Sequence, residues 1–181
     1  MRRLPGDLSL KDYVSRVVRV NHAGEYGAAR IYRGQWDVLS RRGSPAAELV
    51  KEMGEQEREH LDYFTAVMAR RQIRPTALRP FWHVAGYALG AATAMLGDKA
   101  AMACTVAVEE AIDEHYASQI AALQDTDETE LLERIAAFRE DELHHRDVGY
   151  ENGAEEAPAY AMLSSAIKAG AKIAIEIAKR I

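Results

Sequence analysis

The sequence predicts an all-α protein, and three observations support this. Proline is scarce, with 5 in 181 residues, while Ala, Glu, Leu and Arg are plentiful, and this composition favours helix. Apolar residues recur at helical spacing, and no segment shows the alternation typical of a strand. Start and stop signals divide the chain into six helices. With 48% hydrophobic and 28% charged residues, we expect one globular domain over residues 1–181.

The first three helices are bounded by serine caps and prolines. Ser9 is the expected N-cap of the first helix, over about residues 12–40. Ser44 followed by Pro45 predicts a capped second helix that ends near residue 70. Pro75 and Pro80 then break the chain before an apolar third helix, over about residues 80–96.

The last three helices follow from similar signals. Gly97–Asp98 separates the third helix from a fourth that runs to about residue 123. Asp127 with Glu130 three residues later predicts a capping box at the start of the fifth. Asn152–Gly153 ends that helix near residue 151, and Pro158 lies near the start of a sixth that ends at residue 181.

Loop lengths predict how these helices are arranged. Short loops join the first helix to the second and the fourth to the fifth, so each pair should form an antiparallel hairpin. The third helix can serve as the long crossover that ferritin-like bundles use. We therefore expect a ferritin-like four-helix bundle with two additional helices, the crossover helix 3 and the C-terminal helix 6. Helix 6 should pack outside the bundle through Ile167, Ala171, Ala174 and Ala178.

Charge and cysteine content exclude some functions. The formal net charge of -5 argues against a general nucleic-acid binder, which needs a basic surface. The single cysteine, Cys104, cannot form an internal disulfide. Residues 1–10 lack the features of a signal or transit peptide, so we expect a cytoplasmic chain or a trimmed mature form.

Two Glu-x-x-His motifs, Glu57 to His60 and Glu142 to His145, are the strongest chemical signal in the sequence. Residues three apart share a helix face, so each motif can present a carboxylate and an imidazole to one point. Each motif also follows a glutamate at matched spacing, and these glutamates are Glu25 and Glu109. One Glu from each of two helices and Glu-x-x-His from two others is the ligand set of di-iron and di-manganese bundles.

Helical phase supports these six residues as metal ligands. Each of the six lies on the apolar stripe of its helix. The neighbouring Glu110 points about 100° away from Glu109 around the helix axis and so lies off that stripe. Buried carboxylates are costly without a cation, and carboxylates with one imidazole per metal suit iron or manganese. Any one of the six taken alone is better explained as a solvated acidic face or a core histidine. His22, His83 and His144 have no such support and are expected to be structural.

The segment Phe81–Gly97 contains no formally charged residue and has two interpretations. It is shorter than the roughly 20 residues that cross a bilayer. It is therefore either a core helix or an in-plane element that enters a membrane or lines an apolar channel.

Three stretches closely resemble the demethoxyubiquinone hydroxylases, the di-iron monooxygenases of ubiquinone biosynthesis. They are Val20-Asn-His-Ala-Gly-Glu-Tyr-Gly-Ala28, Arg74-Pro-Thr76 and Ala101-Met-Ala-Cys-Thr-Val-Ala-Val-Glu-Glu110, joined by the tail from Ala157-Pro-Ala-Tyr160 onward. The resemblance covers about residues 12–181 without departure at the six ligand positions. It implies hydroxylation of the ring of 2-polyprenyl-3-methyl-6-methoxy-1,4-benzoquinol, with two Fe2+ ions per chain, dioxygen and electrons from NADH.

The same resemblance implies partners and a location. It favours the membrane interpretation of Phe81–Gly97 and a peripheral protein on the cytoplasmic face of a bacterial membrane, or on the matrix face of the mitochondrial inner membrane for a trimmed form. A polyprenyl quinol substrate and a lipid-binding helper protein are implied, and a homo-oligomer is compatible with the sequence. No Gly-rich dinucleotide fingerprint occurs, so a Rossmann-type NADH site is not expected.

Tyr116 and His115 match family positions that are suspected of relaying electrons or protons. Tyr116 lies on the metal-facing stripe, and a core tyrosine bonded to a buried carboxylate is an equal interpretation. Gly24 and Gly27 flank Glu25, and their small size would let a helix or substrate approach, or would serve packing alone.

Three other functions remain open at this level. A ferritin-like iron store or ferroxidase and a manganese catalase would use similar ligands on the same fold, yet neither needs an apolar channel. A metal-free helical scaffold would bind no iron.

Overall fold

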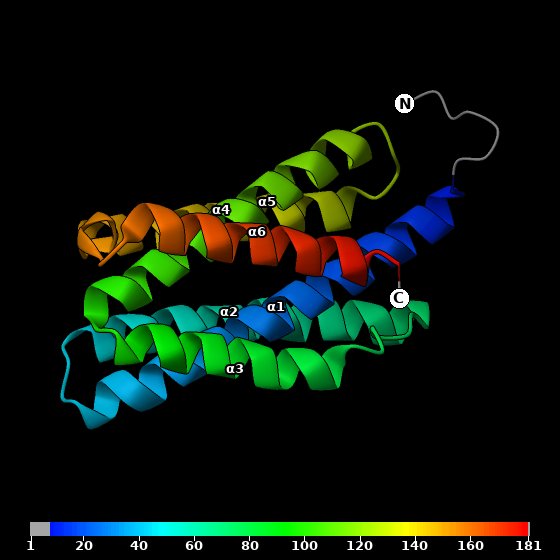
Figure 1. Ribbon diagram of the computed structural model, residues 1–181. Coiled ribbons are helices and arrows are strands. Elements are labelled where there is room, and N and C mark those ends of the chain that lie inside the picture. Colours follow the sequence, from blue (N-terminus) through cyan, green and yellow to red (C-terminus); the bar gives the residue numbers. More distant parts are fainter. Residues whose placement is uncertain (1–7, 181) are drawn as a thin grey trace.

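A computed structural model describes residues 8–180 of the chain. Within that range it contains helices only, which confirms the all-α prediction (Figure 1). The elements are α1 (Leu10–Arg41), α2 (Ala46–Arg71), α3 (Arg79–Met95), α4 (Asp98–Leu123), α5 (Thr129–Glu151), a 3-10 helix (Ala154–Glu156) and α6 (Tyr160–Ala178).

The helices form two three-helix halves that face each other. In the first half α1 packs against both α2 and α3, and in the second half α4 packs against both α5 and α6. Figure 1 shows the two halves as two layers, with α1–α3 on one side and α4–α6 on the other. The four long helices α1, α2, α4 and α5 make the predicted bundle, and α3 and α6 lie beside it.

The serine cap of the first helix is confirmed, and that of the second is displaced by one residue, because Pro45 occupies the N-cap position. The Ser9 hydroxyl accepts a hydrogen bond from the backbone N–H of Asp12 at 3.1 Å. The Ser44 hydroxyl accepts from the backbone N–H of Ala46, also at 3.1 Å, so Pro45 lies just before the helix and not at its first position.

The predicted capping box of the fifth helix is wrong. The turn before α5 is made by Thr126, whose hydroxyl accepts from the backbone N–H of Glu128 and donates to a backbone oxygen of α4. The helix begins at Thr129 with Glu128 at the N-cap and no side-chain cap hydrogen bond, so Asp127 lies one residue before the cap position. Glu130 instead pairs with Arg70 of α2 at 3.1 Å.

Close approach between α1 and α3 depends on glycine. A Cβ atom built on Gly90 of α3 would lie 2.0 Å from the backbone oxygen of Ile31, and one on Gly34 of α1 would lie 2.3 Å from that of Tyr87. Both are far inside van der Waals contact. The glycines therefore let the crossover helix lie directly against α1.

The prediction for α3 is confirmed in one respect. None of the helices described in residues 8–180 is long and apolar enough to cross a bilayer. One face of α3 is nevertheless both exposed and uncharged. It consists of Phe81, Val84, Ala88, Ala92 and Met95.

Candidate metal centre

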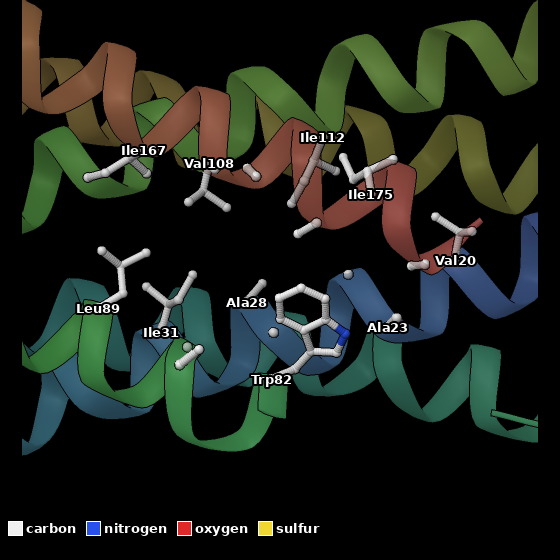
Figure 2. Close-up of a pocket in the computed structure, with 18 of the residues that line it drawn as sticks. Val20, Ala23, Ala28, Ile31, Trp82, Leu89, Val108, Ile112, Ile167 and Ile175 are labelled. Atoms are coloured by element: carbon white, nitrogen blue, oxygen red, sulfur yellow. The ribbon is translucent and has the colours of Figure 1, made fainter. Parts of the chain in front are cut away.

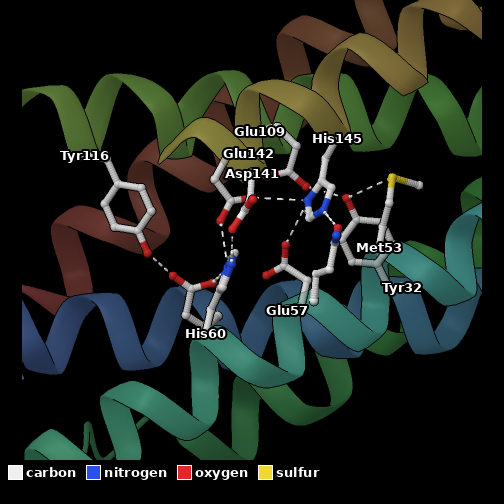
Figure 3. Close-up of polar contacts among 11 residues, drawn as sticks. Tyr32, Met53, Glu57, His60, Glu109, Tyr116, Asp141, Glu142 and His145 are labelled. Carbon is white, nitrogen blue, oxygen red and sulfur yellow. Dashed lines mark hydrogen bonds and ion pairs between the residues drawn. The ribbon is translucent and has the colours of Figure 1, made fainter. Parts of the chain in front are cut away.

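The six predicted ligands come together in the middle of the bundle (Figure 3). Glu25 comes from α1 and Glu109 from α4, while the two Glu-x-x-His motifs come from α2 and α5. All six side chains are at most 2% exposed. They are buried because each lies on the apolar stripe of its helix, in phase with the core residues above and below it.

The six residues form two overlapping groups, and in each group the potential ligand atoms lie within 4.8 Å of one another. The first group is Glu25, Glu57, His60 and Glu142, and the second is Glu57, Glu109, Glu142 and His145. Glu57 and Glu142 belong to both groups. This is the arrangement expected when two carboxylates bridge two metal ions.

Both imidazoles turn their Nδ1 atoms toward the carboxylates. His60 Nδ1 lies 3.3 Å from Glu142 Oε1 and 3.7 Å from Glu25 Oε2. His145 Nδ1 lies 3.2 Å from Glu57 Oε1 and 3.3 Å from Glu142 Oε2. These are ion-pair distances without the alignment of a hydrogen bond, so the atoms converge on shared points.

Eight converging atoms are buried and have no hydrogen-bond partner, a condition that natural cores normally avoid. They are Glu25 Oε2, both oxygens of Glu57, His60 Nδ1, Glu109 Oε2, both oxygens of Glu142 and His145 Nδ1. Four carboxylates and two imidazoles arranged in this way fit a pair of hard divalent cations. These residues can therefore hold metal.

Electrostatics within the centre favours added positive charge. Burial and the negative charge of Glu142 raise the pKa of Glu57 and Glu109 well above the ordinary carboxyl value. Burial alone would lower the pKa of His60, but its contacts with Glu142 and Glu25 raise that pKa to about 12. A cation between the carboxylates would relieve their repulsion, which is the physical reason for metal affinity.

The Nε2 atom of each imidazole is held by the residue directly before the glutamate of the opposite Glu-x-x-His motif. His60 Nε2 lies 3.1 Å from Asp141 Oδ2, and His145 Nε2 lies 2.6 Å from Gln56 Oε1. Both oxygens accept, so each Nε2 carries the proton and each Nδ1 is left as the ligand atom. Sequence reasoning missed Asp141 and Gln56, although their matched positions before Glu142 and Glu57 were a usable signal.

Two buried tyrosines bond the remaining glutamates. The Tyr116 hydroxyl donates to Glu25 Oε1, a contact that fits a core tyrosine and a relay residue equally. The Tyr32 hydroxyl donates to Glu109 Oε1 at 2.6 Å. Burial, followed by the charge of the nearby glutamates, raises the pKa of both phenols, so each remains a donor. Sequence reasoning missed the role of Tyr32.

His115 lies beside Tyr116 and outside the ligand cluster. Its ring stacks on that of Tyr116 with centroids 6.4 Å apart. Gln119 Nε2 lies 2.7 Å from His115 Nε2, and Gln119 exchanges two further hydrogen bonds with Asn21 of α1. Since Gln119 Nε2 is the donor, His115 Nε2 accepts and the imidazole is neutral.

The other three histidines lie outside the ligand cluster, as expected. His83 Nδ1 bonds the hydroxyl of Tyr26 at 2.6 Å. His22 is buried and His144 is exposed.

An apolar pocket of about 440 Å³ lies between the two halves (Figure 2). Its walls come from α1, α3, α4 and α6 and include the predicted apolar face of α6. Figure 2 shows Ile31 and Leu89 on one side and Val108 and Ile167 on the other. Val108 directly precedes the ligand Glu109, and the lining residue Gly24 directly precedes Glu25, so adjacent residues of α4 and of α1 serve the pocket and the centre.

Gly24 and Gly27 line this pocket, and a Cβ atom on either would have no heavy atom within 4 Å. They therefore leave space for a bound molecule and are not required by helix packing. The pocket reaches the surface at α6, where the lining residues Ala166 and Gly170 are exposed.

A second, polar pocket of about 920 Å³ lies between α1, α2 and α3. Its lining includes Arg30, Arg33, Arg58 and Glu59 as well as Tyr32. Tyr32 is itself 2% exposed, so its ring lies between this pocket and the carboxylates.

Fold and site together define a ferritin-like helical bundle with a carboxylate and histidine centre able to hold metal ions. Residues 12–178 match the family described as "Ubiquinone biosynthesis protein COQ7". The chain belongs to this family.

Named relatives are similar over almost the whole chain. A 3-demethoxyubiquinol 3-hydroxylase of Rhodospirillum rubrum is 55% identical over 179 residues, which cover 99% of this chain and 84% of that protein. The NADPH-dependent 3-demethoxyubiquinone 3-hydroxylase, mitochondrial, of Homo sapiens is 50% identical over 171 residues, 93% of this chain and 78% of that protein. The 5-demethoxyubiquinone hydroxylase, mitochondrial, of Saccharomyces cerevisiae is 37% identical, again over 93% of this chain.

Proposed function

We propose that this protein is a 3-demethoxyubiquinol 3-hydroxylase, a di-iron monooxygenase of ubiquinone biosynthesis. The names of its relatives supply the substrate class. The observation that carries the proposal is that a buried carboxylate centre and an apolar pocket are built on neighbouring residues of the same two helices. Gly24 and Val108 line the pocket, and the buried ligands Glu25 and Glu109 directly follow them in α1 and α4.

The six ligands would hold two iron ions, and Glu57 and Glu142 belong to both groups of potential ligands. When bound, the ions supply the redox chemistry by which dioxygen and two electrons place one oxygen atom on the ring and release the other as water. The chain itself orients the ligands and excludes water, since all six side chains are at most 2% exposed. Asp141 and Gln56 fix the proton of each histidine on Nε2.

The apolar pocket would place the quinol. Its lining is almost entirely aliphatic, which suits a polyprenyl chain and leaves the ring to be aligned by its position beside Glu109. Tyr116 and His115 form a stacked pair beside this centre, and we assign them the transfer of protons or electrons to the Glu25 side.

The membrane would supply the quinol through α3 and α6. The exposed face of α3 is apolar from Phe81 to Met95, and the pocket opens beside Ala166 and Gly170 of α6. A protein docked through α3, on the inner face of a bacterial membrane or its mitochondrial counterpart, could take up a lipid without exposing its tail to water. A lipid-binding helper protein could cover the same face.

The reductant would be a reduced nicotinamide nucleotide. Several relatives are named NADPH-dependent, whereas the sequence resemblance implied NADH. Steady-state rates with each nucleotide, measured on the same iron-loaded protein, would identify the donor.

The decisive experiment uses a short-tailed demethoxyquinone, iron-loaded protein, a nicotinamide reductant and isotopically labelled dioxygen. We expect mass spectrometry to find one labelled hydroxyl on the ring, and none with Glu142→Ala. Unchanged quinone with continued dioxygen consumption would contradict the proposal and favour a ferroxidase. Dioxygen release from hydrogen peroxide would favour a catalase.

A further inference from the structure

The two halves of the protein repeat one pattern around the centre. On α1, Tyr32 follows Glu25 by seven residues, and on α4, Tyr116 follows Glu109 by the same seven. Seven residues are close to two helical turns, so each tyrosine shares the inner face with its own glutamate.

Each tyrosine bonds the glutamate of the opposite half, not its own. Tyr116 of α4 donates to Glu25 of α1, and Tyr32 of α1 donates to Glu109 of α4. Figure 3 shows the two tyrosines at opposite ends of the cluster, with the metal-ligand residues between them.

The tyrosines divide the four glutamates into two kinds. In Glu25 and Glu109 the Oε1 atom is bonded by a tyrosine, and only Oε2 is buried without a partner. In Glu57 and Glu142 neither oxygen has a hydrogen-bond partner. Two glutamates thus offer one oxygen each, and the other two offer both.

Tyr32 is held firmly in this position. Its ring meets the edge of His145 with centroids 6.0 Å apart, and its hydroxyl lies 3.9 Å from the sulfur of Met53. A Cβ atom on Gly54 would lie 3.1 Å from the Cβ of Tyr32, so a glycine at position 54 makes room for the tyrosine. The other side of the ring borders the polar pocket.

We infer that Tyr32 is a positioning residue that makes Glu109 a one-oxygen ligand, as Tyr116 does for Glu25. By occupying Oε1, the phenol leaves Oε2 as the only oxygen of Glu109 free to bind metal. Without the phenol, Glu109 can rotate and bind through both oxygens, which changes the coordination of one ion. The inference rests on the proposed metal centre and concerns one of its two positions.

The test uses Tyr32→Phe, which keeps the ring between the centre and the polar pocket and removes only the hydroxyl. The probe is ferrous iron alone, added without dioxygen. Loss of a hydrogen bond to a ligating carboxylate typically weakens metal affinity roughly 10-fold or more. We therefore expect one of the two ions to bind about tenfold more weakly, and one of the two Mössbauer signals to change. Quinol KM should remain within about twofold of the wild-type value while kcat falls.

Tyr150→Phe is the matched control. Tyr150 donates to Glu110 at 2.8 Å, outside the ligand cluster, so this variant loses the same kind of bond and should match the wild type in iron affinity and spectrum. Gly54→Ala is a second test, because it presses on Tyr32 while retaining the hydroxyl. It should alter the same Mössbauer signal.

Outcomes separate this inference from the proposed function. If wild type binds two ions and hydroxylates the quinol while Tyr32→Phe has an unchanged spectrum and iron affinity, only the inference is wrong. If wild type binds no iron, the proposed metal centre is wrong and the inference fails with it.

Discussion

Glu57 and Glu142 differ from the other two glutamates of the centre because neither of their oxygens has a hydrogen-bond partner. They also belong to both groups of potential ligands, whereas Glu25 and Glu109 belong to one each. Single substitutions should therefore have unequal effects on metal content.

We expect Glu109→Gln to weaken the binding of one metal ion and Glu142→Gln to weaken the binding of both. Elemental analysis after dialysis should give about one iron per chain for the first variant and less than one for the second, against two for wild type, since each shared carboxylate serves both groups. Glu140→Gln, at an exposed position of the same helix, is the control. Equal losses in the two variants would contradict the bridging assignment.

His115 should make the protein less stable in acid. Burial, followed by the positive charge of Lys179, lowers its pKa from 6.5 to about 4. Between those values the unfolded chain binds the proton more readily, so the stability is present above pH 6.5 and is lost as the pH falls toward 4. The loss is at most about 3 kcal/mol.

Urea unfolding at pH 7.5 and pH 5 would measure this effect. Carboxyl groups also titrate in acid, so His115→Gln is needed as the reference. Its stability should fall less than that of wild type between the two pH values, and parallel losses would show that His115 contributes nothing.

Single residues could be predicted from the sequence where their chemistry requires a recognisable spacing. Glu25 and the Glu-x-x-His motifs could be found because ligand spacing and helical phase coincide. Tyr32 and Asp141 were missed because their partners lie on other helices, 77 and 81 residues away in the sequence. Their matched offsets in the two hairpins were the only sequence signal for them.

At the scale of the helices, the contact between α1 and α3 is the most demanding. Gly90 allows the backbones to touch, whereas Gly24 of α1 faces the apolar pocket with no heavy atom within 4 Å of an added Cβ. The two glycines therefore serve packing and binding respectively.

Gly90→Ala and Gly24→Ala should have opposite consequences. The first should lose about 1–3 kcal/mol of unfolding free energy because it overpacks the helix contact. The second should keep or gain up to about 1 kcal/mol from helix propensity but should raise KM for the quinol, since its methyl group enters the pocket. Urea unfolding and steady-state kinetics would measure both. Equal stability losses would show that Gly24 is a packing residue.

The ends of the helices were predictable where caps are local. The Ser9 and Ser44 hydroxyls bond backbone groups two or three residues away, so the sequence alone indicates them. The start of α5 was mispredicted by one residue because Glu128, and not Asp127, occupies the N-cap, while the turn before it is set by Thr126.

For the whole molecule, the apolar face of α3 is expected to decide where the protein resides. Five exposed positions along one side carry no charge, while the protein as a whole has a net charge of -5. Attraction to a membrane should therefore be hydrophobic and insensitive to salt.

Phe81→Asp should weaken binding to phosphatidylcholine vesicles about tenfold or more, because a buried Phe contributes about 1.5–3 kcal/mol. Co-sedimentation at low and high salt would measure it. Ala66→Asp, at an exposed position of α2, adds the same charge elsewhere and should bind as wild type does. Undiminished binding of Phe81→Asp would exclude α3 as the contact.

The overlap of the two ligand groups relates the two halves of the molecule to each other by symmetry. Each group takes three ligands from one half and one from the other: Glu142 completes the group of the first half, and Glu57 completes that of the second. This is the arrangement of a twofold symmetric dimer in which each subunit lends one carboxylate to its partner. The present chain has the organisation of two hairpins related by an approximate twofold axis. A shift of one hairpin against the other would therefore disturb both ligand groups at once, because each group is complete only when both hairpins are in place.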